Sequence, residues 1–549
     1  MDYIISLSIV YVGFICLHLL FINTPMHTDC GELRYPGFFF ARKQIDHAEF
    51  AHKTGLFGNK IFIFYYHLLA YRMFPNAPVV APKIFFIFFN LISASVLFIT
   101  LIHSSIPVKG AIFLVFIFLI LMSYHRFFTC FDSIEKYAVL NSMLLVYFII
   151  VKPDYYSFFI GFLFFIQFFF FKPTYVFEWI AVASFAILEG GILGVFIGFV
   201  FSFLFCILLS YSRFKKKLWD IRNYFNSGLG LVVYWLKLRN SSHIACDKNG
   251  GNRKSKRKKK TGKATFNPSI QFFVSALPGI LLLIAMNLVG IGYSIHYVDS
   301  LFIILSVGVL IGFLIQWRFY PYHYIALIPS SIFMFSLAFR KIDEFSPVCI
   351  VIAGVLVGFL LINIIVSGLK NKEDLLSCLM KPIPHYMNRM LAALIISDRI
   401  QCVRSDWLLQ WGDTPQLNIL SGIPSPAGNE STTPWNWGLS NDKARQALSN
   451  VVDLRPRYLV PMIDNINLEV FTRSTGLHYN HIDTVYVNNE AFRIFQLCDI
   501  GQPSKKISDE MKYDLFLECR KKEGNGRFIW NWSEDRETTA PSCGDGYNS

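Results

Sequence analysis

The chain has 549 residues, of which 54% are hydrophobic and 17% aromatic, with a formal net charge of +14. Only 16% of the residues are charged, well below the roughly 25% usual in soluble domains. This composition excludes an ordinary soluble protein. Apolar runs approaching or exceeding ~18 residues predict transmembrane helices. The runs lack the alternation of barrel strands, so the composition argues against a transmembrane barrel.

Residues 3–22 form the first apolar segment, and we interpret it as a retained membrane anchor because it lacks a basic start and a small-residue cleavage motif. A polar loop over residues 23–60 follows, rich in carboxylates, cations and aromatic residues. Further spans are expected near residues 61–74, 83–103, 109–123, 138–151, 156–171, 173–189, 190–210, 271–292, 298–316, 320–339 and 344–368. The expected fold is therefore an α-helical polytopic membrane protein with about 11–13 transmembrane helices in a domain over residues 1–370.

A long polar insertion, residues 211–268, interrupts the apolar segments and contains the basic run RKSKRKKK. No base-stacking or groove-reading module surrounds this run, so we expect no nucleic-acid partner and favour a loop that touches anionic headgroups or sets topology. The eleven cysteines are scattered without metal-ligand spacing, and we predict no metal site.

The composition changes after Lys370, and residues 371–502 are predicted to form a small soluble α/β domain. The segment NDKARQALSNVVDL has the pattern of a capped helix, and RYLVPMI and IDTVYVNN are typical of strands. Residues 503–549 are expected to be a loosely ordered polar tail.

Asp29 and Glu32 lie just beyond the first apolar segment. A carboxylate at a membrane interface is partly desolvated, which raises its proton affinity and makes it a usable general base. The alternative is an ordinary solvated acid, or a partner for Arg34. His52 and Lys53 precede the next apolar segment and suit the phosphate of a lipid, although anchoring to headgroups is an equally good interpretation.

The segment QWRFYPYHY, which contains Arg318, Tyr322 and His323, lies between two apolar segments. It offers a guanidinium fork together with hydroxyl and imidazole donors. An aromatic belt at the membrane surface is the alternative. Belts seldom place so many hydrogen-bonding groups around one arginine, so we favour a binding site.

Taken in order, these motifs resemble the polytopic GT-C glycosyltransferases, most closely the family 39-like branch of protein O-mannosyltransferases and lipid A aminoarabinose transferases. The resemblance rests on HTDCGE, on His52-Lys53, on the acidic pair Asp132 and Glu135, on Lys172-Pro173 and on the Arg318 segment. WGDTPQLNILSGIPSPAG is similar to a strand-and-turn segment of bacterial members. The absence of β-trefoil repeats also favours a bacterial type.

The resemblance implies an inverting transfer of a sugar from polyprenyl phosphate to a protein, lipid A or glycan acceptor. Asp29 or Glu32 would be the base. The implied donor-phosphate ligands are Lys53, Arg318, Tyr322 and His323, and the implied substrate-orienting residues are His52, Asp132 and Glu135. No cofactor is implied, and a divalent metal is left open. We expect a bacterial inner membrane, with the endoplasmic reticulum as the alternative.

Other classes remain open at this stage. A flippase or transporter for lipid-linked sugars would share the spans and the cations, and would carry charges near the bilayer midplane. A non-catalytic subunit of a polysaccharide assembly complex would not need the acids. An O-antigen-type ligase would carry its large external loop late in the chain.

Overall fold

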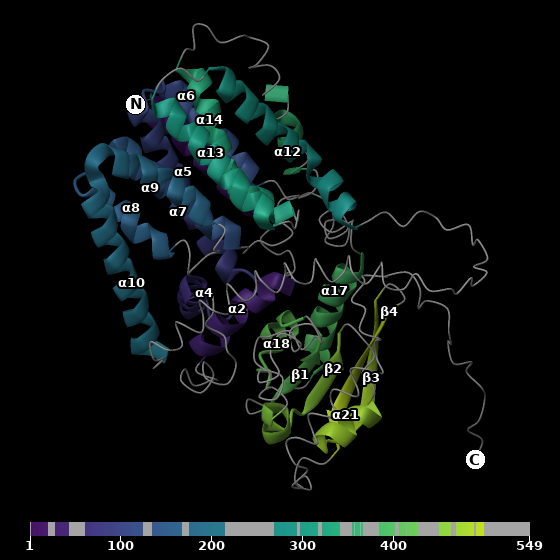
Figure 1. Cartoon of the computed structure of the whole chain (residues 1–549). Coiled ribbons are helices and arrows are strands. Elements are labelled where there is room, and N and C mark those ends of the chain that lie inside the picture. The colour runs from purple at the N-terminus through teal and green to yellow at the C-terminus, as the bar shows by residue number, and fades with distance from the viewer. Residues whose placement is uncertain are drawn as a thin grey trace, which may run out of the picture.

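The structure is a computed structural model, shown in Figure 1. It describes residues 2–19, 28–42, 61–123, 134–166, 175–214, 268–293, 297–316, 321–340, 354–355, 357–362, 364–365, 384–400, 406–412, 414–426, 449–462, 468–487 and 490–498. These residues are mostly helical, and a small sheet lies towards the C-terminus.

The larger part is a bundle of apolar helices, at the top of Figure 1. Its helices are α1 (Asp2–Leu19), α5 (Ala81–His103), α6 (Val108–Ser123), α7 (Ile134–Val151), α8 (Tyr156–Phe165), α9 (Val176–Ala186), α10 (Ile192–Phe214), α12 (Pro268–Gly292), α13 (Tyr297–Gln316) and α14 (Leu327–Phe339). A single hydrophobic core, which includes Phe118, Phe302 and Phe333, joins them. The predicted helices at these positions are confirmed.

Two helical stretches among the described residues, Ala81–His103 and Val176–Phe205, are long and apolar enough to cross a membrane, by length and composition alone. The second stretch is not one straight helix. A short π-helical turn, η4 (Ile187–Gly191), separates α9 from α10, and Gly190 has a left-handed φ of +88°. With 23 residues, α10 alone reaches about 35 Å at 1.5 Å per residue.

Helices α8 and α10 pack closely through glycines. A Cβ at Gly198 would meet the carbonyl oxygen of Phe158, and a Cβ at Gly161 would meet that of Val195. Gly194 lies one turn before Gly198 and faces Ser157. Small residues spaced four apart let two backbones approach closely, which is a packing mode common between transmembrane helices.

Two shorter helices, α2 (Thr28–Ala41) and α4 (Ile61–Met73), pack against each other between the bundle and the sheet (Figure 1). A Cβ at Gly37 would lie 2.6 Å from the Cβ of His67, so this glycine permits the close approach. The predicted polar loop therefore contains a helix. The crossing expected over residues 61–74 is the 13-residue α4, about 20 Å long, which packs along α2.

The C-terminal sheet has the strand order β1-β2-β4-β3. Its strands are β1 (Leu408–Trp411), β2 (Tyr458–Pro461), β3 (Tyr479–Val487) and β4 (Glu490–Leu497). β1 and β2 are parallel, and the other two pairs are antiparallel. The strands expected in RYLVPMI and IDTVYVNN are confirmed as β2 and β3. Of the expected helix in NDKARQALSNVVDL, residues 449–454 are described, and they are helical.

Helices cover both faces of the sheet. Helices α17 (Pro384–Arg399) and α18 (Gln416–Ser421) pack on one face, where Ile396 and Leu417 contact Val460 and Ile494 through a shared core. Helix α21 (Leu468–Thr475) packs on the other face. The segment WGDTPQLNILSGIPSPAG, likened above to a strand-and-turn segment, begins at the end of β1 and continues as the short helix α18.

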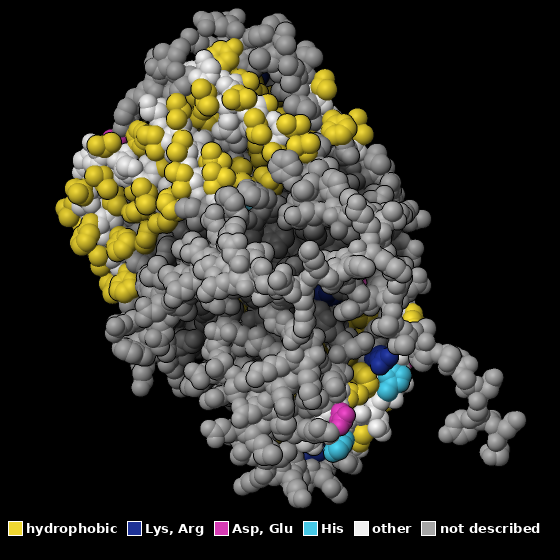
Figure 2. All heavy atoms as spheres, turned by 45° about the vertical axis from the view of Figure 1, so that its right-hand side comes forward, with side chains coloured by type: hydrophobic (Ala, Val, Ile, Leu, Met, Phe, Trp, Pro, Cys, Tyr) yellow, Lys and Arg dark blue, Asp and Glu magenta, His cyan; other side chains and the backbone are white. Residues whose placement is uncertain are grey.

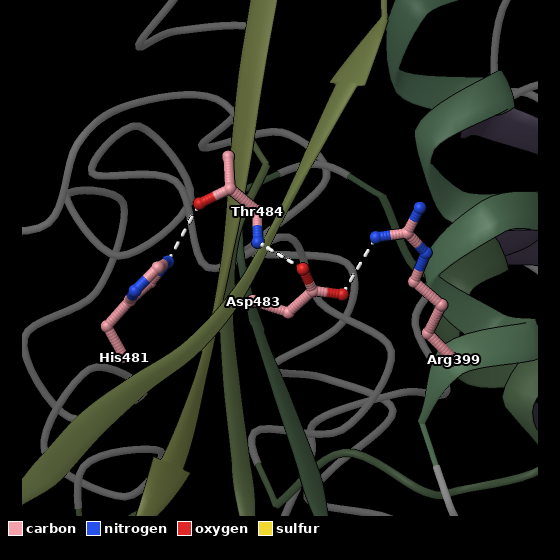
Figure 3. A network of polar contacts seen from close by, with 4 residues as sticks. All are labelled: Arg399, His481, Asp483 and Thr484. Carbon is pink, nitrogen blue, oxygen red and sulfur yellow. Dashed lines mark hydrogen bonds and ion pairs between the residues drawn. The ribbon is translucent and has the colours of Figure 1, made fainter.

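The exposed edge strand β3 is tied to α17 by the network in Figure 3. Arg399 Nη1 lies 2.8 Å from Asp483 Oδ2, and the second carboxylate oxygen accepts a hydrogen bond from the Thr484 backbone N–H. These contacts lower the pKa of Asp483, the hydrogen bond from Arg399 being the largest cause. His481 hydrogen-bonds the Thr484 hydroxyl at 2.8 Å, beside the irregularity between His481 and Asp483.

Candidate functional site

The structure describes only some of the predicted site residues. Asp29 and Glu32 lie in the first turns of α2, Glu135 is the second residue of α7, and Tyr322 lies in the 3-10 turn η5 (Pro321–Ala326). The side chains of these four residues lie outside the described part, as do His52, Lys53, Asp132 and Arg318 altogether. His323 is described and buried. The turn η5 packs against α7, so the predicted segments that carry Tyr322, His323 and Glu135 belong to neighbouring elements.

Helix α2 itself carries a buried arginine. Arg34 is 1% exposed, and its Nη1 donates hydrogen bonds to the backbone carbonyls of Val79, at 3.0 Å, and Pro78, at 3.4 Å. These carbonyls belong to the turn that leads into α5. Arg34 therefore fixes the helix with the two candidate acids against the start of α5.

Two buried lysines lie at the same end of the bundle. Lys83 in α5 and Lys136 in α7 are each 2% exposed. The Nζ of Lys136 lies 4.3 Å from the centre of the Phe86 ring, within the range of a cation–π contact. Lysine and arginine are almost never fully buried unless they are paired. All three cations have contacts within the protein, and we call Arg34, Lys83 and Lys136, which are buried in three neighbouring elements, the cation cluster.

Aromatic hydroxyls and a histidine connect the elements that carry the cation cluster. Tyr66 of α4 donates a hydrogen bond to the Pro82 carbonyl at 2.7 Å, and its ring centre lies 4.5 Å from that of Tyr137. The Tyr137 hydroxyl lies 3.5 Å from His67 Nε2. These contacts hold α4, the start of α5 and the start of α7 together, so the cations belong to one layer.

Helices α1 and α6 extend this layer. The buried His18 Nδ1 lies 3.3 Å from the Ser123 hydroxyl and 3.2 Å from the Phe14 carbonyl. The His18 ring also lies 5.7 Å from Phe86, the ring that contacts Lys136. The end of the bundle next to α2 is therefore rich in buried hydrogen-bonding groups.

The C-terminal part meets α2 directly. The hydroxyl of the fully buried Tyr35 accepts a hydrogen bond from the Ser425 backbone N–H at 2.6 Å. Ile419 of α18 packs into the aromatic cluster that Tyr35 shares with Phe38 and Phe39. Burial raises the pKa of Tyr35, so its hydroxyl stays protonated. We call this contact of α2 with residues 419–425 the junction.

No family model matches the chain, and no curated protein matches it. The likeness to GT-C glycosyltransferases therefore rests on the motifs described above. No group of three or more His, Cys, Asp or Glu residues that could hold a metal ion occurs in the described part.

Sequence reasoning did not single out Lys83 or Lys136, and it treated Arg34 only as a partner for the acids. A lone lysine at the end of an apolar segment normally extends to the membrane surface, so the local sequence gives no sign that it is buried. The one available signal for Lys136 in the sequence is its position directly after Glu135, a member of the acidic pair.

Proposed function

We propose that the chain is an integral membrane protein whose apolar bundle crosses the bilayer several times. Hydrophobic side chains gather on the face of the bundle that the upper part of Figure 2 shows. On α10, Leu193 is 68% and Phe196 62% exposed, and on α12 Leu288 is 63% exposed. Soluble monomers rarely expose large contiguous apolar surfaces, and lipid is the environment that covers this one.

The contacts of α4 bear on which side of the membrane the N-terminus, α2 and the C-terminal part lie. The sequence predicted twelve crossings, one of them over residues 61–74. This segment is α4, which packs along α2, and we do not count it as a crossing. The eleven that remain place the N-terminus and the C-terminal part on opposite sides. The C-terminal part then shares a side with α2, as the hydrogen bond between Tyr35 and Ser425 requires. We assign this side to the exterior of a bacterial inner membrane, with the lumen of the endoplasmic reticulum as the alternative.

We infer that the protein transfers a sugar from a polyprenyl-phosphate donor to an acceptor with inversion. The observation that supports this inference is the cation cluster, in which Arg34 is buried on the helix that carries Asp29 and Glu32 and the two lysines are buried on α5 and α7. As the bond from the anomeric carbon to the phosphate oxygen breaks, the lipid phosphate takes the electron pair and gains negative charge. Preorganised buried cations stabilise such developing charge better than mobile surface lysines do.

In this mechanism Asp29 or Glu32 accepts the proton of the acceptor hydroxyl as its oxygen attacks the anomeric carbon. The sugar leaves the phosphate with inverted configuration, and polyprenyl phosphate is released. Lys53, Arg318, Tyr322 and His323 remain the predicted additional phosphate ligands, and His52, Asp132 and Glu135 the predicted orienting groups. The acceptor is a protein, lipid A or a glycan.

The test is transfer of radiolabelled sugar from a panel of polyprenyl-phosphate monosaccharides by the purified full-length protein. Asp29→Asn or Glu32→Gln is expected to abolish release of polyprenyl phosphate. Lys136→Met is expected to reduce it at least about 100-fold, as for the loss of one preorganised donor. The control is Lys109→Met, which removes an exposed lysine from α6. Full activity of both acid variants would refute the assigned mechanism.

A flippase for lipid-linked sugars is the second candidate, and a buried carboxylate favours it. Glu178 of α9 is 2% exposed and accepts a hydrogen bond from the Ser142 hydroxyl at 2.8 Å. Ionisable groups inside a bundle often mark transport pathways. Protein-dependent movement of the lipid across liposomes, without release of polyprenyl phosphate, would identify this function.

A further inference from the structure

One buried side chain next to the junction lacks the hydrogen bonds that its chemistry requires. Gln416, the first residue of α18, is 1% exposed. Neither its Oε1 nor its Nε2 has a hydrogen-bond partner within the described part of the chain. Buried amide groups are nearly always hydrogen-bonded to protein or ordered water, because burying an unpaired amide costs free energy.

Its neighbours Asn418 and Gln410 are held by hydrogen bonds, although Asn418 Oδ1 and the Thr414 hydroxyl also have no partner among the described residues. Asn418 Nδ2 donates to the carbonyls of Leu408, at 2.9 Å, and Ile423, at 3.0 Å, which ties α18 to β1. Gln410 Oε1 accepts a hydrogen bond from the Thr414 N–H at 3.1 Å. These equally buried amides have structural roles, whereas the described structure assigns none to the amide of Gln416.

The position of Gln416 on α18 indicates which way it faces. Gln416 and Ile419 are three residues apart in one helix and therefore lie on the same side. Ile419 packs against Tyr35 and Phe38 of α2, and α18 contacts α2 directly. Gln416 thus lies on the side of α18 that faces the helix carrying the candidate acids.

We propose that Gln416 binds hydroxyl groups of a sugar at the junction between α18 and α2. A glutamine amide offers two donors and an acceptor on one plane, which matches two neighbouring hydroxyls of a sugar ring. It carries no charge, so it suits the neutral ring rather than the phosphate. This inference rests on the proposed function and adds a specificity residue from the C-terminal part. Because the amide is covered, the sugar enters when the junction opens.

The first experiment compares Gln416→Met with Gln410→Met in the purified full-length protein without ligand. Methionine has a similar volume and removes the amide. Gln416→Met is expected to keep or raise the melting temperature, because the replaced amide has no partner. Gln410→Met is expected to lower it, because the Thr414 N–H loses its acceptor. A clear fall in melting temperature for Gln416→Met would show that the amide has a structural partner, which would overturn the proposal.

The second experiment measures binding by the same two proteins and wild type. The probes are undecaprenyl phosphate without sugar, a panel of undecaprenyl-phosphate monosaccharides, and the corresponding methyl glycosides. Gln416→Met is expected to bind the sugar-bearing lipid at least tenfold more weakly than wild type and the bare lipid equally well. Loss of methyl-glycoside binding instead would identify the acceptor sugar as the ligand.

The outcomes separate this inference from the proposed function. Binding of a methyl glycoside that depends on Gln416, without binding of any polyprenyl phosphate, would refute the donor and retain the sugar site. Binding of every probe by Gln416→Met as by wild type would overturn the inference.

Discussion

The hydroxyl of Tyr35 joins α2 to the C-terminal part. The substitution Tyr35→Phe removes only this hydroxyl and keeps the aromatic ring. The ring contact with Phe39, at 4.5 Å between ring centres, remains. The buried Ser425 N–H, which lies 2.6 Å from the hydroxyl, loses its acceptor. Leaving a buried donor unpaired costs about 1–3 kcal/mol.

This free energy sets how often the junction between α2 and residues 419–425 is open. Because every ~1.4 kcal/mol changes an equilibrium constant tenfold, the open junction becomes about 5- to 150-fold more populated in Tyr35→Phe. The cost is confined to one contact, so the helices of the apolar bundle keep their stability. Hydrogen exchange of the α2 backbone amides, measured on the purified full-length protein, reports this opening directly.

A matched control lies inside the C-terminal part. The buried Tyr479 donates a hydrogen bond to the Pro456 carbonyl at 2.6 Å, so Tyr479→Phe also removes one buried tyrosine hydroxyl. It is expected to speed exchange in β2 and β3 and to leave α2 unchanged. Unchanged exchange of α2 in Tyr35→Phe would refute the claim that the junction holds this helix.

Two further predictions concern helix packing and pH. Gly198→Ala is expected to lower the stability of the bundle by about 1–3 kcal/mol, because the added Cβ meets the Phe158 carbonyl. Gly13→Ala, whose Cβ meets nothing, is the neutral control in thermal unfolding. The lowered pKa of Asp483 means that the contact with Arg399 stabilises the folded state above about pH 4 and is lost as pH falls through the folded pKa. Asp483→Asn should therefore reduce the acid-side fall in melting temperature, and an unchanged profile would count against the ion pair.

The regular elements of this protein could be predicted from local patterns. Helix α5 follows from an apolar run with Pro82 near its start, and β2 and β3 follow from short β-branched and aromatic runs bounded by polar residues. The place of α4 could not be predicted, because an apolar helix buried beside α2 and one facing lipid have similar compositions. The close approach that decides it depends on one glycine, Gly37, contacting a residue thirty positions later.

The residues of the candidate site could be predicted from the sequence only in part. Asp29 and Glu32 are conspicuous in the sequence because they lie in a polar loop between two apolar segments. Lys83 and Lys136 become notable only through burial, which is a property of the packed structure. Gln416 is a stronger case, because a glutamine in a polar segment attracts no attention until its amide is found buried and without a partner among the described residues.

The junction also has a consequence for the order in which the protein matures. Tyr35 and Ser425 are 390 residues apart in the sequence. At about 5–20 residues per second, synthesis of the intervening chain takes roughly 20–80 s. Every helix of the apolar bundle has been made by then, while α2 still lacks its last partner. A ribosome-bound chain therefore carries the candidate acids before it carries the segment that fixes α2.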